Sequence, residues 1–241
     1  MQARGEEQLI RRRHLLVVLL TFVSGATDAT GFLALGGAFT SVMTGNIVLL
    51  GLSAARADGE LAGHVAAAIV CYVGGCALGA RLAGRSRAND QLWPPSVSRA
   101  LRVELGALAV YACGWWVTGG HLSAAAQLAL LAVNAMALGI QSSAVQRFGV
   151  AGLSTTYLTG TLTTLVVRLT SERDLRAIAD SGKQLLALLG GAAMASLLVT
   201  HFRALVPVVP LACLVTVLVS STRLGAESAS ALDAQPVPAN R

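Results

Sequence analysis

Long apolar runs alternate with short polar segments over almost the whole chain. Eight runs can be distinguished, at about residues 14–34, 38–55, 62–83, 101–118, 123–145, 150–169, 184–200 and 204–221. A transmembrane α-helix needs roughly 20 consecutive apolar residues, and most of the runs approach that length. The pattern therefore predicts an all-α integral membrane protein.

The composition supports this fold class. Of the 241 residues, 54% are hydrophobic and only 12% are charged, whereas a soluble domain carries about 25% charged residues. The basic residues behind the net charge of +6 lie between the apolar runs, where arginine and lysine act as topology signals. We therefore expect the lipid bilayer to surround the protein, and no nucleic-acid partner.

Arginine positions predict which runs cross the membrane. Residues 1–13 and 81–104 are the two most arginine-rich segments between runs, so both should be cytoplasmic. An even number of crossings must separate them, yet three runs lie between. The 38–55 run is the natural exception, because Thr44-Gly45-Asn46 interrupts it and leaves about nine helical residues, half a bilayer in length.

The same argument applies to the 150–169 run, which Thr159-Gly160-Thr161 interrupts. The predicted fold has about six transmembrane helices plus two broken or re-entrant half-helices. Both termini would be cytoplasmic, in a bacterial cytoplasmic (inner) membrane. Arg11-Arg12-Arg13 before the first run is also typical of a signal peptide, but the run continues without a break into the most distinctive motif, which favours an uncleaved span.

Two halves of the chain resemble each other. The segments 40–46 and 155–161 align 115 positions apart, Gly25 aligns with Gly139, and Gly74-Gly75 aligns with Gly190-Gly191. We predict a membrane repeat at 14–120 and a second at 121–222, between a cytoplasmic tail at 1–13 and a disordered tail at 223–241. With three crossings each, the copies would be inverted, as in many secondary transporters.

Asp28 is interpreted as the one acidic residue within an apolar run, because the other eleven acidic residues are assigned to loops, tails or the ends of spans. A carboxylate in a spanning helix is costly, so a role in proton or cation coupling is the default hypothesis. The alternative is an interfacial residue that only caps a helix. Ser24 lies one helical turn before Asp28 and shares its face.

The two interrupted runs supply the other candidate residues for binding a solute or ion. Glycine allows the backbone to leave helical geometry, and serine, threonine and asparagine cap a helix start. The half-helices are predicted at 47–55 and 162–170. The candidates are Ser41, Thr44, Gly45, Asn46, Thr156, Thr159, Gly160 and Thr161. Ordinary kinked helices are the alternative.

Gln141 and Asn134 lie seven residues apart on one face of the fifth run. They would line the same cavity or bond neighbouring helices. The small-residue pairs Gly75-x-x-x-Gly79 and Gly191-x-x-x-Ala195 are predicted to be helix-packing seams.

Signatures of catalysis are missing from the sequence. No Gly-rich phosphate loop follows a strand, and no HExxH or GxSxG motif occurs. The four cysteines all fall in apolar runs and form no ligand set. We expect no enzyme activity, no cofactor and no metal site.

The segments Phe22–Ala29 and Gly36–Asn46 resemble the YoaK-type family of bacterial multi-pass membrane proteins, a domain of unknown function. The Ser-Gly-x-x-Asp-Ala and Met-Thr-Gly-Asn elements carry the resemblance, which covers roughly residues 14–220. It implies a cytoplasmic-membrane protein and names no substrate.

From the residues, we predict a small-solute or ion transporter with a mid-membrane site between inverted repeats. Asp28 would couple to protons or cations, and the two Thr-Gly turns would bind solute. A passive channel and a non-transporting membrane scaffold are the alternatives, and a homo-oligomer is compatible with each.

Overall fold

Helices are the regular secondary structure of the regions that the computed structural model describes, residues 2–85, 91–148, 158–171 and 175–233, and no strand occurs in them. The elements are α1 (Gln2–Ala34), α2 (Met43–Ala55), α3 (Gly59–Ala83), α4 (Pro95–Val117), α5 (Ala124–Gln146), α6 (Leu158–Ser171), α7 (Leu175–His201), η1 (Arg203–Leu205) and α8 (Val208–Asp233). Six of them are long and apolar enough to cross a membrane, and α2 is a shorter apolar helix. The predicted all-α membrane fold is confirmed.

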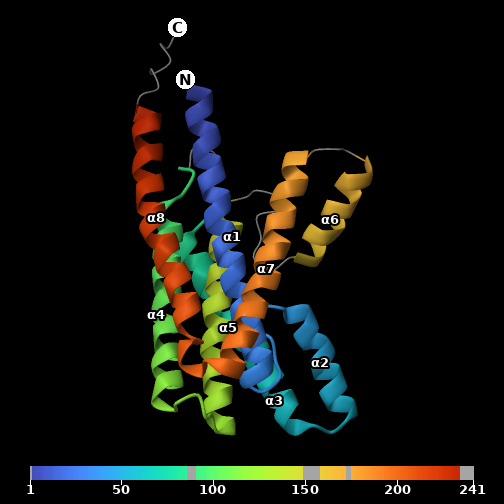
Figure 1. Ribbon diagram of the computed structural model, residues 1–241. Coiled ribbons are helices and arrows are strands. Elements are labelled where there is room, and N and C mark those ends of the chain that lie inside the picture. The colour runs from blue at the N-terminus through green and yellow to red at the C-terminus, as the bar shows by residue number, and fades with distance from the viewer. Residues whose placement is uncertain (1, 86–90, 149–157, 172–174, 234–241) are drawn as a thin grey trace.

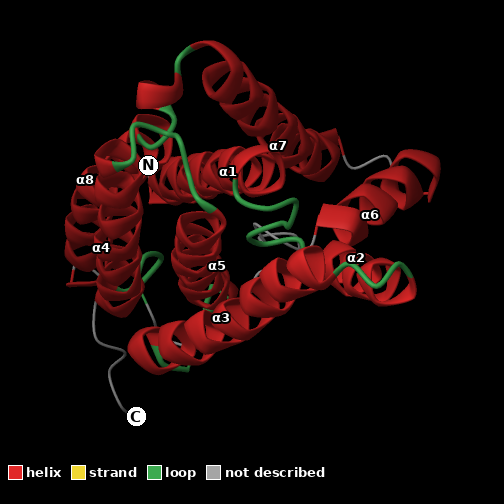
Figure 2. Cartoon of the chain, turned by 90° about the horizontal axis from the view of Figure 1, so that it is seen from below, coloured by secondary structure: helices red, strands yellow, loops and turns green. Residues whose placement is uncertain are grey.

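The long helices run up and down between two ends of the molecule. Figure 1 shows the N-terminal end of α1 and the C-terminal end of α8 at one end, with the α2–α3 and α4–α5 turns at the other. The two short helices, α2 and α6, lie on one side of the long helices in both views, with their N-terminal ends towards the middle (Figures 1 and 2).

The chain breaks earlier than predicted before α2. The non-helical segment covers residues 35–42, where Gly36 and Gly37 adopt φ angles of 90° and 78°, which side chains disfavour. Thr44-Gly45-Asn46 instead forms part of the first turn of α2. Gly160 and Thr161 likewise are helical, within α6. Helix α2 thus starts at 43 and not at 47, and the chain is already helical at 158, the first described residue of α6, and not only from 162.

Helices also extend beyond the predicted apolar runs. The tail predicted at 1–13 is part of α1 from Gln2 onward, and arginine, glutamine and glutamate favour helix there. Of the tail predicted to be disordered, residues 223–233 continue α8, and 234–241 lie outside the described residues. α4 begins at Pro95 and not near 101, because proline fits the first helical turn.

Two close helix seams organise the long helices. A Cβ atom at Gly25 of α1 would strike the Leu188 carbonyl of α7, and one at Gly191 of α7 would strike the Phe22 carbonyl of α1. Glycine is needed at both positions because the backbones touch.

The second seam joins α3 and α5. A Cβ atom at Gly75 would strike the Met136 carbonyl, and one at Gly139 would strike the Tyr72 carbonyl. Gly79 also meets Ile140, and Ala195 in the α1–α7 seam is buried. The predicted roles of the small-residue pairs as packing seams are confirmed.

The helix α5 lies at the centre of the molecule. Seen end-on, it is surrounded by α1, α3 and α4 (Figure 2). Its buried residues run from Leu130 to Val145 and include Asn134 and Gln141. Large apolar side chains such as Val48, Val70 and Val117 are exposed on the outside, as expected for a protein surrounded by lipid.

Candidate functional site

Asp28 lies on α1 six residues before its end at Ala34, which is about 9 Å along the helix. Its side chain is only 6% exposed and faces the 35–42 segment that leads into α2. Because both Gly36 and Gly37 turn the chain back at this point, the segment passes beside α1.

The Asp28 carboxylate accepts four hydrogen bonds from two consecutive residues. Its Oδ1 accepts from the Thr40 amide at 2.8 Å, the Thr40 hydroxyl at 3.0 Å and the Ser41 amide at 2.7 Å. Its Oδ2 accepts from the Ser41 hydroxyl at 2.6 Å. We call Asp28, Thr40 and Ser41 the carboxylate clamp. Four donors satisfy an ionised carboxylate, which is acceptor-only.

Asn46 holds the same segment from the other side. Its Oδ1 accepts from the Phe39 amide at 2.9 Å, and its Nδ2 donates to the Phe39 carbonyl at 2.7 Å. Asn46 is fully buried in the first turn of α2. It therefore replaces the backbone partners that Phe39 lacks outside a helix.

A cavity of about 380 Å³ lies against the clamp, between α1, the 35–42 segment and α7. This volume is in the range of small-molecule sites. Its lining residues are Gly25, Asp28, Ala29, Phe32, Leu33, Phe39, Val42, Leu188, Ala192 and Ser196. The rings of Phe32 and Phe39 stack with their centroids 5.1 Å apart, so the carboxylate faces a largely apolar space.

A second polar contact joins α1 to the central helix. The Nε2 atom of Gln141 on α5 donates to the Ser24 hydroxyl at 2.9 Å and to the Leu20 carbonyl at 3.1 Å. Ser24 precedes Asp28 by one turn on α1. Gln141 thus bonds a neighbouring helix, one of the two roles considered from the sequence.

The predicted site residues fall into two groups. The structure gathers Ser24, Asp28, Ser41, Asn46 and Gln141 around α1. Thr44 is exposed on α2, and Gly45 faces the Phe39 ring.

The second-half residues lie on α6. Gly160 is half-buried and Thr161 is buried there, and Thr159 belongs to the same helix. Thr156 lies outside the described residues.

Sequence reasoning missed Thr40 and Phe39, which complete the contacts of Asp28 and Asn46. The prediction that Asp28 is the one acidic residue within a span was wrong, because Glu104 is fully buried within α4. The error came from starting the fourth helix near 101. The Pro94-Pro95 pair marks the true start and places Glu104 well inside the span.

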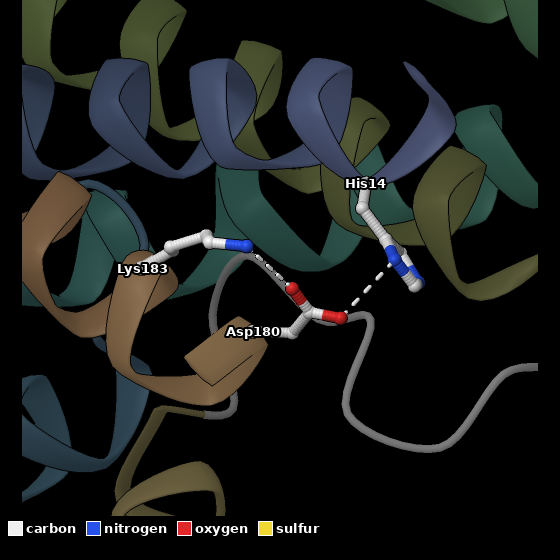
Figure 3. Close-up of polar contacts among 3 residues, drawn as sticks. All are labelled: His14, Asp180 and Lys183. Atoms are coloured by element: carbon white, nitrogen blue, oxygen red, sulfur yellow. Dashed lines mark hydrogen bonds and ion pairs between the residues drawn. The ribbon is translucent and has the colours of Figure 1, made fainter. Parts of the chain in front are cut away.

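A polar contact ties α1 to α7 far from the carboxylate clamp. Figure 3 shows Asp180 of α7 between His14 of α1 and Lys183. The His14 Nδ1 atom lies 3.4 Å from Asp180 Oδ2, and Lys183 Nζ lies 2.8 Å from Asp180 Oδ1. A separate cavity of about 770 Å³ opens beside these residues. Within the described residues, no group of three or more histidine, cysteine, aspartate or glutamate side chains could hold a metal ion.

Comparison with known proteins agrees with a multi-pass membrane protein. Residues 16–220 match a family model described as a protein of unknown function (DUF1275). The chain is 34% identical over 154 residues to the UPF0700 transmembrane protein YoaK of Bacillus subtilis (strain 168), which covers 64% of this chain and 66% of that protein. No solved structure matches the chain. The chain belongs to this family of uncharacterised multi-pass membrane proteins.

Proposed function

We propose that the protein is a small-solute or ion transporter whose site is the cavity beside the carboxylate clamp. The observation that carries the proposal is a buried carboxylate on the wall of a 380 Å³ cavity between α1, the 35–42 segment and α7. A charged group within a transmembrane region is expensive and typically marks a substrate or ion pathway. Transport, and not catalysis, is the role we assign.

The lining of the cavity favours a solute with a cationic or donor end. Three of the four donors bond Oδ1, and within the described residues Asp28 Oδ2 accepts one hydrogen bond, so Oδ2 has a lone pair for another donor. Phe32 and Phe39 offer aromatic surface beside it, which suits an apolar or cationic body. Small alkylammonium ions combine these two properties.

Internal symmetry supports a transporter with two inverted copies, α1–α4 and α5–α8. Gly45 of α2 and Gly160 of α6 are 115 positions apart in the sequence, and the glycine pairs 74–75 of α3 and 190–191 of α7 are 116 apart. The first helix of each copy packs against the third helix of the other, through Gly25 and Gly191 in one seam and Gly75 and Gly139 in the other. The cavity lies in one of these seams, between the copies.

The α1–α7 seam also offers a way to alternate access. The cavity is near the C-terminal end of α1, whereas the His14–Asp180 contact ties the same two helices near the opposite end. We propose that the His14–Asp180 contact breaks when the cavity becomes accessible from the end of the molecule where this contact lies. The N- and C-termini would be cytoplasmic, in an inner membrane, as the arginine distribution predicts.

The test is Asp28→Asn in proteoliposomes with an imposed pH or sodium gradient. The probes are ethylammonium, tetramethylammonium, Na⁺ and K⁺, followed as transient currents and as tracer uptake. An asparagine oxygen can still accept from Thr40 and Ser41, and its amide can donate to the Ser41 hydroxyl. We expect gradient-driven uptake to be lost while the melting temperature changes little.

Thr40→Val is the matched control, because it removes one hydroxyl from the clamp and keeps the charge. We expect it to retain uptake. Full gradient dependence in Asp28→Asn would contradict the coupling role. Flux that persists in Asp28→Asn without any gradient dependence would favour a passive channel, and no flux of any probe in the wild type would favour a scaffold.

A further inference from the structure

Glu104 is an acidic side chain buried without a partner. It has no exposed surface, and neither carboxyl oxygen forms a hydrogen bond within the described part of the chain. It lies nine residues beyond Pro95, about 14 Å along α4, inside a helix that is long and apolar enough to cross a membrane and two residues after the exposed Arg102. An ionised carboxylate that is buried without a partner is strongly unfavourable, whereas the neutral acid is tolerated far better.

The antiparallel packing of α4 and α5 places Gln141 level with Glu104. A Cβ atom at Gly114 would meet the Leu130 side chain, so these two positions face each other. Ten residues before Gly114 is Glu104, and eleven residues after Leu130 is Gln141. By the same count, Tyr111, three residues before Gly114, is level with Asn134, four residues after Leu130. The Tyr111 hydroxyl lies beside the Asn134 side chain without meeting the geometry of a hydrogen bond.

Gln141 presents an acceptor and not a donor at this level. Its Nε2 donates to the Leu20 carbonyl and the Ser24 hydroxyl. A carbonyl can only accept, so the Leu20 contact identifies the nitrogen end of the amide. The Oε1 atom, also buried, has no hydrogen-bond partner within the described residues. A neutral carboxylic acid has one O–H donor, which matches this acceptor, while a carboxylate has none.

We propose that Glu104 is a second ionisable site, a membrane-embedded carboxyl that binds an exchangeable proton opposite Gln141. The proton is shared with Gln141 Oε1, directly or through one bound water. Gln141 connects this site through Ser24 to the helix face of Asp28. Tyr111 and Asn134 are buried, and within the described residues their side-chain polar atoms have no hydrogen-bond partner, so they extend the same polar column along α4 and α5.

No arginine, lysine or histidine of the described residues forms an ion pair with Glu104. α4 packs against α5 and α8, and less extensively against α3. No charged residue occurs in α5 or in α8 up to Thr222, where Cys213 is the titratable group. The titratable groups of α1 and α3 include Arg13, His14, Asp28, Tyr72 and Cys76, and α4 itself carries Arg99, Arg102 and Tyr111. Within the described residues, none of them forms a hydrogen bond with the Glu104 carboxyl oxygens.

The test is infrared spectroscopy of the full chain in lipid nanodiscs at neutral pH. We expect the spectrum of the wild type minus that of Glu104→Gln to contain the carbonyl stretch of a protonated carboxylic acid. Transfer of the folded protein into D₂O should shift this band, because the proton exchanges. Gln141→Leu should move the band by removing its acceptor, whereas Gln127→Leu on the same helix should leave it in place.

Two results would overturn the proposal. If Glu104→Gln removes carboxylate bands and no protonated-acid band, Glu104 is ionised and paired with a cation. If the band is present but does not shift in D₂O until the protein unfolds, Glu104 is an inert structural acid. Neither result depends on a transported solute, so the outcome is separate from that of the Asp28→Asn uptake test.

Discussion

Several buried polar side chains of this protein form hydrogen bonds with other parts of the same chain. Asp28 receives four donors from Thr40 and Ser41, and Asn46 pairs both backbone groups of Phe39. Unpaired backbone groups at membrane depth are costly, which explains why such residues follow a break in the helix. Asn46 is thus a positioning residue that sets the wall of the cavity through Phe39.

At the residue scale, Asn46→Ala should destabilise the protein and distort the cavity. It leaves the Phe39 amide and carbonyl without their partners, which costs about 1–3 kcal/mol. We expect a lower melting temperature in detergent and weaker solute-induced stabilisation. Ser53→Ala is the control on the same helix, because Ser53 is also buried and, within the described residues, its hydroxyl bonds only the Leu50 carbonyl of its own turn. An equal loss in both variants would show that Asn46 has no special role.

At the scale of the helices, the two glycine seams determine how closely α1 packs against α7 and α3 against α5. Adjacent glycines differ sharply in what surrounds them. Gly75 faces the Met136 carbonyl of α5, whereas Gly74 has open space where its Cβ would be. Gly191 faces the Phe22 carbonyl, while Gly190 would make only ordinary contact with the Phe22 ring, 3.6 Å away. Only one glycine of each pair is required for backbone contact.

This difference predicts the effect of alanine in the seams. Gly75→Ala and Gly191→Ala should each destabilise the fold by roughly 1–3 kcal/mol, because the added methyl group forces the helices apart. Gly74→Ala should be neutral or stabilising by up to about 1 kcal/mol, since alanine favours helix. Melting temperatures and the yield of folded protein measure the difference. Similar losses in Gly74→Ala and Gly75→Ala would contradict the seam.

For the whole molecule, the arrangement of α2 distinguishes a re-entrant helix from a seventh span. α2 has 13 residues, about 20 Å of helix, which is too short to cross a bilayer of roughly 30 Å. Its C-terminal end turns into α3 at the same end of the molecule as the α4–α5 turn (Figure 1). Both turns should therefore be on one side of the membrane.

Single cysteines in a cysteine-free background test this topology. Arg56→Cys, in the α2–α3 turn, and His121→Cys, in the α4–α5 turn, should both react with a membrane-impermeant thiol reagent in intact cells. Arg85→Cys, after α3, should react only after the membrane is permeabilised. All three positions are exposed in the structure. Labelling of positions 56 and 121 from opposite sides would mean that α2 crosses the membrane.

Much of the architecture could be predicted from the sequence. Apolar runs of bilayer length predict the six long helices, because a chain in lipid must satisfy its backbone hydrogen bonds within each helix. The small-residue pairs predict the packing seams, because small side chains four residues apart on one helix face allow another helix to approach closely. Their polarity inside apolar runs identified five of the candidate residues, and these do lie on or around α1: Ser24, Asp28, Ser41, Asn46 and Gln141.

Tertiary structure decided what each of those residues contacts. No local pattern shows that the 35–42 segment returns to Asp28, because that contact spans twelve residues and depends on the φ angles of Gly36 and Gly37. The proposal that Glu104 lies level with Gln141 likewise depends on the antiparallel packing of α4 and α5, in which Gly114 meets Leu130. Hydropathy along one chain identifies which residues avoid water, whereas the partner of a buried polar atom is set by the distance between helices.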